Sequence, residues 1–147
     1  DPTNVDSYFR DISTFGGSTA GPAAALEVLK IIKREKLLEN VNEVGEHLKN
    51  KLLELQEKHE MIGEVRGKGL FCGVELVKDR TTKEPVDETV AASVAAHCFK
   101  NKVMIGRTNR SFETNNNVLL FSPAFICTKT DIDLIVESVD NALEANK

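Results

Sequence analysis

Residues 62–77, which read IGEVRGKGLFCGVELV, decide the fold of this chain. In this stretch apolar residues alternate with polar or small ones, and Gly67-Lys68-Gly69 separates two such runs. Alternation with a period of two, interrupted by glycines, is typical of two strands joined by a tight turn. The stretch therefore predicts two neighbouring antiparallel strands, over 62–66 and 70–77.

Helical periodicity surrounds these strands on both sides. Residues 37–58 carry apolar side chains at steps of three and four, which predicts a long amphipathic helix. An alanine-rich stretch predicts another helix near 20–35. After the strands, Asp87 is placed to cap a third helix, and Thr128 with Asp131 forms a capping-box-like start for a fourth.

The remaining elements complete an α+β pattern. Two short apolar runs, 103–105 and 118–121, predict strands separated by the polar loop 108–117, and residues 78–85 are expected to form a polar excursion. The order is helix, long helix, two strands, helix, two strands, helix, without an internal repeat. We expect a small, mainly antiparallel sheet with helices packed on one face.

Composition and charge narrow the classes of partner. The chain has 147 residues, of which 41% are hydrophobic and 29% charged, as in a globular protein. Its net charge of -4 gives no cationic surface for nucleic acid or an anionic membrane. No apolar run has the length of a membrane helix, and the first residues show no signal-peptide pattern. A cytoplasmic location is expected.

The cysteines and histidines suggest neither a disulfide framework nor a metal site. They are Cys72, Cys98 and Cys127, and His47, His59 and His97. The cysteines are odd in number and widely spaced, so we interpret each as a small buried apolar residue. The histidines lie on predicted helices without a paired Cys, Asp or Ser constellation, so we expect surface or helix-packing roles, and no metal.

Residues 13–26, STFGGSTAGPAAAL, have the chemistry of a phosphate-binding turn. A hydroxyl is followed by two glycines, which let backbone amides approach closely, and then by the positively polarised start of a helix. Such a short segment alone is more often a plain glycine turn before a helix. Whether this segment indicates phosphate binding therefore depends on matches later in the chain.

Those matches resemble the C-terminal, small domain of class III pyridoxal-phosphate-dependent aminotransferases. The segment 13–26 resembles the family's Thr-Phe/Tyr-Gly/Ser-Gly segment, 63–76 its V-R-G-x-G-L-x-x-G-I-E-L strand pair, and 118–128 its closing A-P-P-L-x-x-T segment. The resemblance covers about residues 8–145. It implies a lead-in and glycine turn from the large-domain junction over 1–18 and the small domain over 19–147.

The resemblance also implies roles for particular residues. In the family the threonine of the first segment reaches the cofactor phosphate of the neighbouring subunit, which assigns cofactor binding to Thr14 with Phe15. Arg107 matches the position where ω-amino-acid:pyruvate members bind the substrate carboxylate, a task that suits a planar guanidinium. Leu120 stands where ornithine-type members carry an arginine. A solvated charge at a strand end remains an alternative for Arg107, and Arg110 competes with it.

The implied enzyme would move an amino group from an ω-amino acid or amine to a 2-oxo acid such as pyruvate, as a homodimer with shared active sites and pyridoxal 5'-phosphate as cofactor. The lysine that binds the cofactor covalently lies upstream of the Thr-Phe-Gly-Gly segment in this class, so no catalytic residue is expected here and this chain alone should be inactive. Two alternatives stay open. One is a non-catalytic α+β domain for dimerisation or anion binding, and the other is a related class III aminomutase or decarboxylase.

Overall fold

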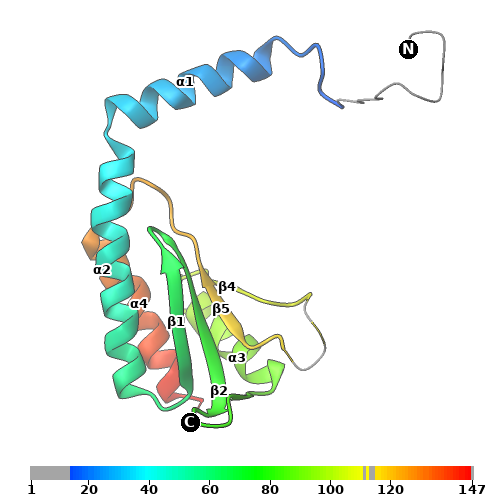
Figure 1. The fold of residues 1–147 in the computed structure, drawn as a ribbon, viewed down its shortest axis with the longest axis vertical. Helices are drawn as coiled ribbons and strands as arrows, with labels where there is room; N and C mark the ends of the chain where they lie inside the picture. The colour runs from blue at the N-terminus through cyan, green and yellow to red at the C-terminus, as the bar shows by residue number, and fades with distance from the viewer. Residues whose placement is uncertain (1–13, 111, 113–114, 147) are drawn as a thin grey trace, which may run out of the picture. The chain divides into compact units, whose positions relative to one another are not determined.

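The computed structural model describes residues 14–110, 112 and 115–146. The chain divides into two units between Glu35 and Lys36. Its helices and strands are α1 Ala20–Arg34, α2 Leu37–Lys58, β1 Ile62–Lys68, β2 Phe71–Asp79, β3 Glu84–Pro85, α3 Glu88–Lys100, β4 Gly106–Arg107, β5 Val118–Phe121 and α4 Lys129–Glu144 (Figure 1). None of the described helices is both long enough and apolar enough to cross a membrane.

The described part of the first unit consists of a turn and the helix α1. Thr19 is the N-cap but makes no capping bond with its side chain, and the Gly21 N–H instead donates to Ser18 Oγ at 3.4 Å. No side chain of α1 is buried, and Leu26 and Leu29 are 55% and 64% exposed. The predicted helix is confirmed, but its apolar side chains have no core within residues 14–35, the described part of this unit.

The second unit is built on an antiparallel sheet in the order β1-β2-β5-β4, with β3 paired to β2 (Figure 1). The central strand β2 pairs with β1 on one side and with β5 on the other, with Val74 opposite Leu119. Alternate residues of β2 belong to a core that also contains Leu48 and Leu52 of α2 and Val136 of α4. The α+β class with helices on one face of the sheet is therefore confirmed, as are the two adjacent strands.

Two details of the sheet differ from the sequence-based expectation. The strand predicted at 103–105 is wrong, because β4 comprises Gly106 and Arg107. Val103 instead donates its N–H to the carbonyl of Cys98 at 2.9 Å, so its backbone belongs to the end of α3. The expected polar excursion contains the short strand β3, whose proline lies on the edge of the sheet, where its missing N–H is tolerated.

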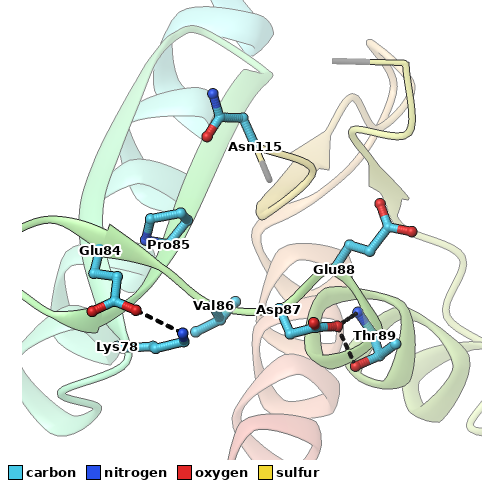
Figure 2. A pocket seen from close by; sticks show the side chains of 8 residues that line it. All are labelled: Lys78, Glu84, Pro85, Val86, Asp87, Glu88, Thr89 and Asn115. Carbon is cyan, nitrogen blue, oxygen red and sulfur yellow. Dashed lines mark hydrogen bonds and ion pairs between the residues drawn. The ribbon is translucent and has the colours of Figure 1, made fainter. Parts of the chain in front are cut away.

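Both predicted helix caps are present. Asp87 Oδ1 accepts the Thr89 N–H at 2.8 Å (Figure 2), and hydrogen bonds from the Thr89 hydroxyl and N–H lower the pKa of Asp87. Thr128 and Asp131 form the reciprocal capping box at the start of α4. These caps satisfy backbone N–H groups at the first turns of α3 and α4.

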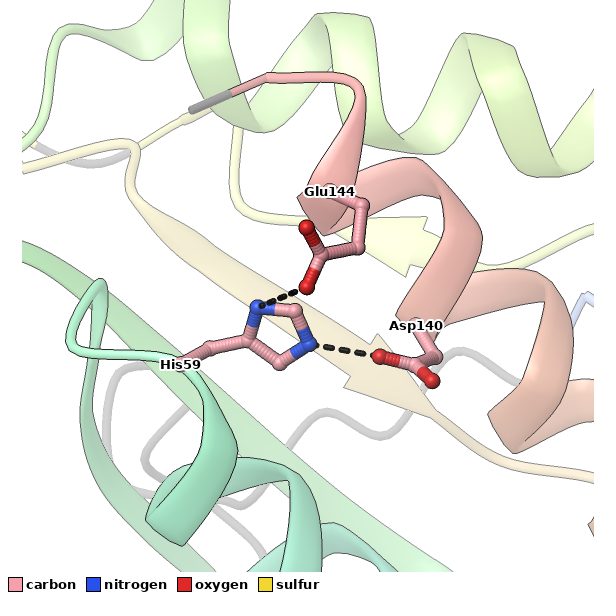
Figure 3. Close-up of side chains that lie close together, drawn as sticks. All are labelled: His59, Asp140 and Glu144. Carbon is pink, nitrogen blue, oxygen red and sulfur yellow. Dashed lines mark hydrogen bonds and ion pairs between the residues drawn. The ribbon is translucent and has the colours of Figure 1, made fainter.

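A buried histidine joins the ends of α2 and α4 (Figure 3). His59 is 2% exposed, its Nε2 lies 2.6 Å from Asp140 Oδ1, and its Nδ1 lies 3.8 Å from Glu144 Oε1. Lys58 Nζ also lies 2.7 Å from Asp140. The expectation that no aspartate pairs with a histidine is thus wrong for His59. His47 likewise lies 2.7 Å from an aspartate of α4, Asp133.

The helix α2 approaches the β1–β2 turn at backbone distance. A Cβ added to Gly45 would lie 2.4 Å from the carbonyl carbon of Gly69 and 2.5 Å from its Cα. Gly69 has a φ of 55°, in the left-handed region that glycine adopts without strain. A side chain at Gly45 would therefore force the backbone to shift, and one at Gly69 would meet Val41 Cγ1 at 2.9 Å.

We expect Gly45→Ala to destabilise the fold by about 1–3 kcal/mol, the usual cost of overpacking, despite the better helix propensity of alanine. The free energy of urea-induced unfolding measures this effect. Gly21→Ala in α1 is the matched control, because its new Cβ would meet only Ser18 Oγ, at 3.8 Å. Equal stability of the two variants would mean that α2 can move away from the turn without cost.

We expect Asp140→Asn to lower the melting temperature at neutral pH and to flatten its dependence on acid. Burial raises the pKa of Asp140, but the hydrogen bonds and charges of Lys58 and His59 outweigh it, and the pKa is lowered. A carboxyl with a lowered pKa stabilises the fold above its unfolded value of about 3.9, and this contribution is lost as the pH falls through the folded value.

Melting curves of wild type and Asp140→Asn between pH 7 and pH 3 test this expectation. Asp133→Asn is the control, because Asp133 also pairs with a histidine, while its side chain is 54% exposed and its ion pair is worth little. An Asp140→Asn variant as acid-sensitive as the wild type would contradict the role given to this carboxylate.

Candidate substrate and cofactor site

The second unit places Arg107 at the end of the short strand β4. Arg107 lies opposite Leu119 of β5 and is partly exposed. Its Nη1 donates to the carbonyl oxygen of Thr108 at 3.2 Å. None of the carboxylates among the described residues forms an ion pair with it. Within the described part of the chain, most donors of this guanidinium are therefore available for another acceptor.

Two clefts border the strand that carries Arg107. Gly106 lines an apolar cleft of about 510 Å³ between β4, β5 and α4. Thr108 lines a more polar cleft of about 370 Å³, together with Arg66 and Glu75. The arginine predicted to bind substrate is therefore part of a strand flanked by concave surface.

One other cation near this strand, Arg66, is committed to ion pairs within the chain. Arg66 Nη1 lies 2.6 Å from Glu75 and 2.9 Å from Glu64, and the hydrogen bond to Glu75, ahead of the charges, raises its pKa. Arg110, the competitor of Arg107, is exposed.

A further cleft, beside α3, is explained by local contacts. It measures about 720 Å³ and lies around β3 and the start of α3 (Figure 2). Its charged groups pair with close neighbours, Lys78 with Glu84 at 2.7 Å and Asp87 with Thr89. These groups serve the β2–β3 pairing and the cap of α3, so this cleft carries no predicted site residue.

The first unit contains the residues predicted to hold the cofactor phosphate. Thr14 and Phe15 lie in a turn over 14–17, where both side chains are exposed. Gly17 has a φ of 85° with open space around it, and α1 begins at Ala20 with no acidic residue in its first turn. A hydroxyl, a glycine turn and an unscreened helix N-terminus fit a phosphate group. Thr14 and Arg107 lie in different units, so each is described by itself.

One group of side chains in the described residues has metal-ligand chemistry. His59, Asp140 and Glu144 each offer a ligand atom, and these atoms lie within 4.8 Å of one another. The two ring nitrogens, however, face different carboxylates (Figure 3). Lys58 also contacts Asp140 already. The arrangement is that of an ion-pair network.

Sequence reasoning missed two polar residues that fix the β4–β5 end of the sheet. Thr108 donates its N–H to Val118 O at 2.9 Å and accepts the Val118 N–H with its Oγ1 at 3.2 Å. Asn117 is 3% exposed, and its Nδ2 donates to Leu76 O at 2.6 Å. Both lie at the ends of a loop expected to be merely polar, and no periodic signal distinguishes them from its other members.

Comparison with known proteins relates these features to one family. The family model described as Aminotransferase class-III matches residues 4–143. The taurine–pyruvate aminotransferase of Bilophila wadsworthia is 54% identical over 142 residues, which are 97% of this chain and 31% of that protein.

Solved structures agree. A Bacillus anthracis aminotransferase superposes with a TM-score of 0.90 at 36% identity, over 97% of this chain and 32% of that one. A PLP-bound amine transaminase from an uncultivated Pseudomonas species gives 0.85 at 28% identity, over 99% of this chain and 32% of that one. This chain thus spans about a third of the length of the proteins it matches, and it belongs to the class III aminotransferase family.

Proposed function

We propose that this chain is the C-terminal part of a pyridoxal-phosphate-dependent transaminase that moves an amino group from an ω-amino acid or amine to pyruvate. The observation that carries the proposal is Arg107, a partly exposed guanidinium whose hydrogen-bond partner among the described residues is a neutral carbonyl. A planar cation with free donors is suited to bind a carboxylate through two parallel hydrogen bonds.

The names of the relatives narrow the chemical class of the proposed amino donor. The Bilophila wadsworthia relative, at 54% identity, is named a taurine–pyruvate aminotransferase. Taurine carries a sulfonate where an ω-amino acid carries a carboxylate, and both anions present oxygens that a guanidinium binds. We therefore propose an ω-amino sulfonate as the donor class, with Arg107 binding the anionic end of the donor and of pyruvate in turn.

Thr14 and the turn that follows it are the proposed phosphate contact of the cofactor. Its hydroxyl and the amides of the glycine turn would hold the phosphate, and the start of α1 would add a favourable dipole. When bound, pyridoxal phosphate supplies the electron sink that lets an amino group pass between two substrates. We further propose a cytoplasmic homodimer in which Thr14 of one subunit contacts the cofactor bound by the other.

We expect Arg107→Ala in the full-length enzyme to raise KM for pyruvate by roughly 10- to 100-fold, as for a lost charge-assisted pair. The half-reaction with a simple amine that carries no carboxylate or sulfonate should change much less, because that substrate offers no anion. Steady-state kinetics with pyruvate, and single-turnover kinetics with the amine, provide the two measurements. Arg110→Ala is the control and should leave both unchanged.

Equal losses in the two half-reactions would mean that Arg107 supports the fold and not substrate choice. A large effect in Arg110→Ala instead would transfer the anion-binding role to Arg110.

We expect Thr14→Ala in the full-length enzyme to weaken cofactor retention by about 1.5–3 kcal/mol, the cost of one hydrogen bond to a charged group. The dissociation constant of pyridoxal phosphate, measured by equilibrium dialysis, tests this. Thr19→Ala is the control, because the Thr19 side chain makes no capping hydrogen bond. An unchanged constant in Thr14→Ala would reduce Thr14 to a turn residue.

A further inference from the structure

In the last hydrogen-bonded pair of the β4–β5 ladder, a side-chain hydroxyl takes the place of a backbone carbonyl as acceptor. In a regular antiparallel ladder, each residue of a hydrogen-bonded pair donates its N–H to the carbonyl oxygen of the residue opposite. Gly106 lies opposite Leu120 and Arg107 opposite Leu119, which brings Thr108 opposite Val118. Thr108 donates its N–H to Val118 O at 2.9 Å as expected, but the Val118 N–H is accepted by Thr108 Oγ1 at 3.2 Å.

The exchange releases one backbone acceptor. Because the hydroxyl takes the Val118 N–H, the carbonyl oxygen of Thr108 does not serve in the ladder. That oxygen accepts Nη1 of Arg107 at 3.2 Å. A single threonine therefore completes the sheet with its side chain and holds the neighbouring guanidinium with its backbone.

The nature of this partner suits an anion-binding arginine. A carboxylate at this place would neutralise the guanidinium and compete with an anionic substrate. A neutral carbonyl limits the freedom of the long side chain without cancelling its charge. Among the described residues, one of the five guanidinium donors is occupied, which leaves the fork open to a carboxylate or sulfonate.

We propose that Thr108 is a positioning residue for Arg107. Its hydroxyl replaces its own carbonyl in the sheet, so that this carbonyl orients the guanidinium toward the anionic end of the substrate. The proposal rests on the proposed function, because it presumes that Arg107 binds that anion. It adds a requirement for a hydroxyl at residue 108 that substrate contact alone does not impose.

Thr108→Val in the full-length holoenzyme is the decisive variant, because valine keeps the β-branched shape and removes the acceptor. The Val118 N–H should then turn to the carbonyl of residue 108, and Arg107 should lose its partner. We expect KM for pyruvate to rise about two- to tenfold, the size of effect of one neutral hydrogen bond, with kcat nearly unchanged. KM for a simple amine without a carboxylate or sulfonate should not change. Thr108→Ser, which keeps the hydroxyl, should show the wild-type KM for pyruvate.

A crystal structure of the Thr108→Val enzyme supplies a readout other than activity. It should show the Val118 N–H on the carbonyl of residue 108 and Nη1 of Arg107 away from it. The wild-type arrangement retained in this variant would overturn the proposal. Equal KM changes for pyruvate and the simple amine would also overturn it. A Thr108→Ser variant that does not keep the wild-type KM for pyruvate would do the same, since either result would indicate a purely structural role.

The Arg107→Ala enzyme distinguishes a failure of the positioning role of Thr108 from a failure of the proposed function. If Arg107→Ala raises KM for pyruvate while Thr108→Val behaves as wild type, the positioning role is refuted and the proposed function stands. If Arg107→Ala has no effect on KM for pyruvate, the anion-binding role of Arg107 fails and the positioning role of Thr108 falls with it.

Discussion

The close approach of α2 to the β1–β2 turn is the constraint on which the second unit depends. Gly45 and Gly69 meet at backbone distance, so the first half of the helix is held against the strand pair. The C-terminal end of α2 is held by the contact of His59 with Asp140 of α4. These two contacts favour one register in which the leucines of α2 are buried against β2, and this defines the face of the sheet that is covered.

The candidate site depends on that core through the order of the strands. The buried strand β5 lies between β2 and the two-residue strand β4, so β4 joins the sheet through β5 and also contacts α3. An edge strand of this length is held by few ladder bonds, which explains why a side-chain hydroxyl, that of Thr108, contributes one of them. Precision at Arg107 thus comes from the residues that end the ladder.

Local patterns in the sequence foretold most of the elements, because periodicity and capping residues are properties of neighbouring positions. The helix starts at Asp87 and Thr128 were predictable for this reason, as was the hairpin around Gly67. The partners of His59 were not, since Asp140 lies 81 residues away. β4 was misplaced because apolar Val103 serves the end of α3, and Thr108 acts through geometry that residue type alone does not reveal. Arg107 was found only through the family resemblance.

The exposed apolar side chains of α1 bear on how this chain would behave in solution. Leu26 and Leu29 are exposed and, three residues apart, share one face of a helix that buries none of its residues. Contiguous apolar surface of this kind promotes self-association in water. Expressed by itself, the chain would tend toward oligomers or precipitation at high concentration, whereas residues 36–147, which have a core of their own, would be the more soluble piece for biophysical work.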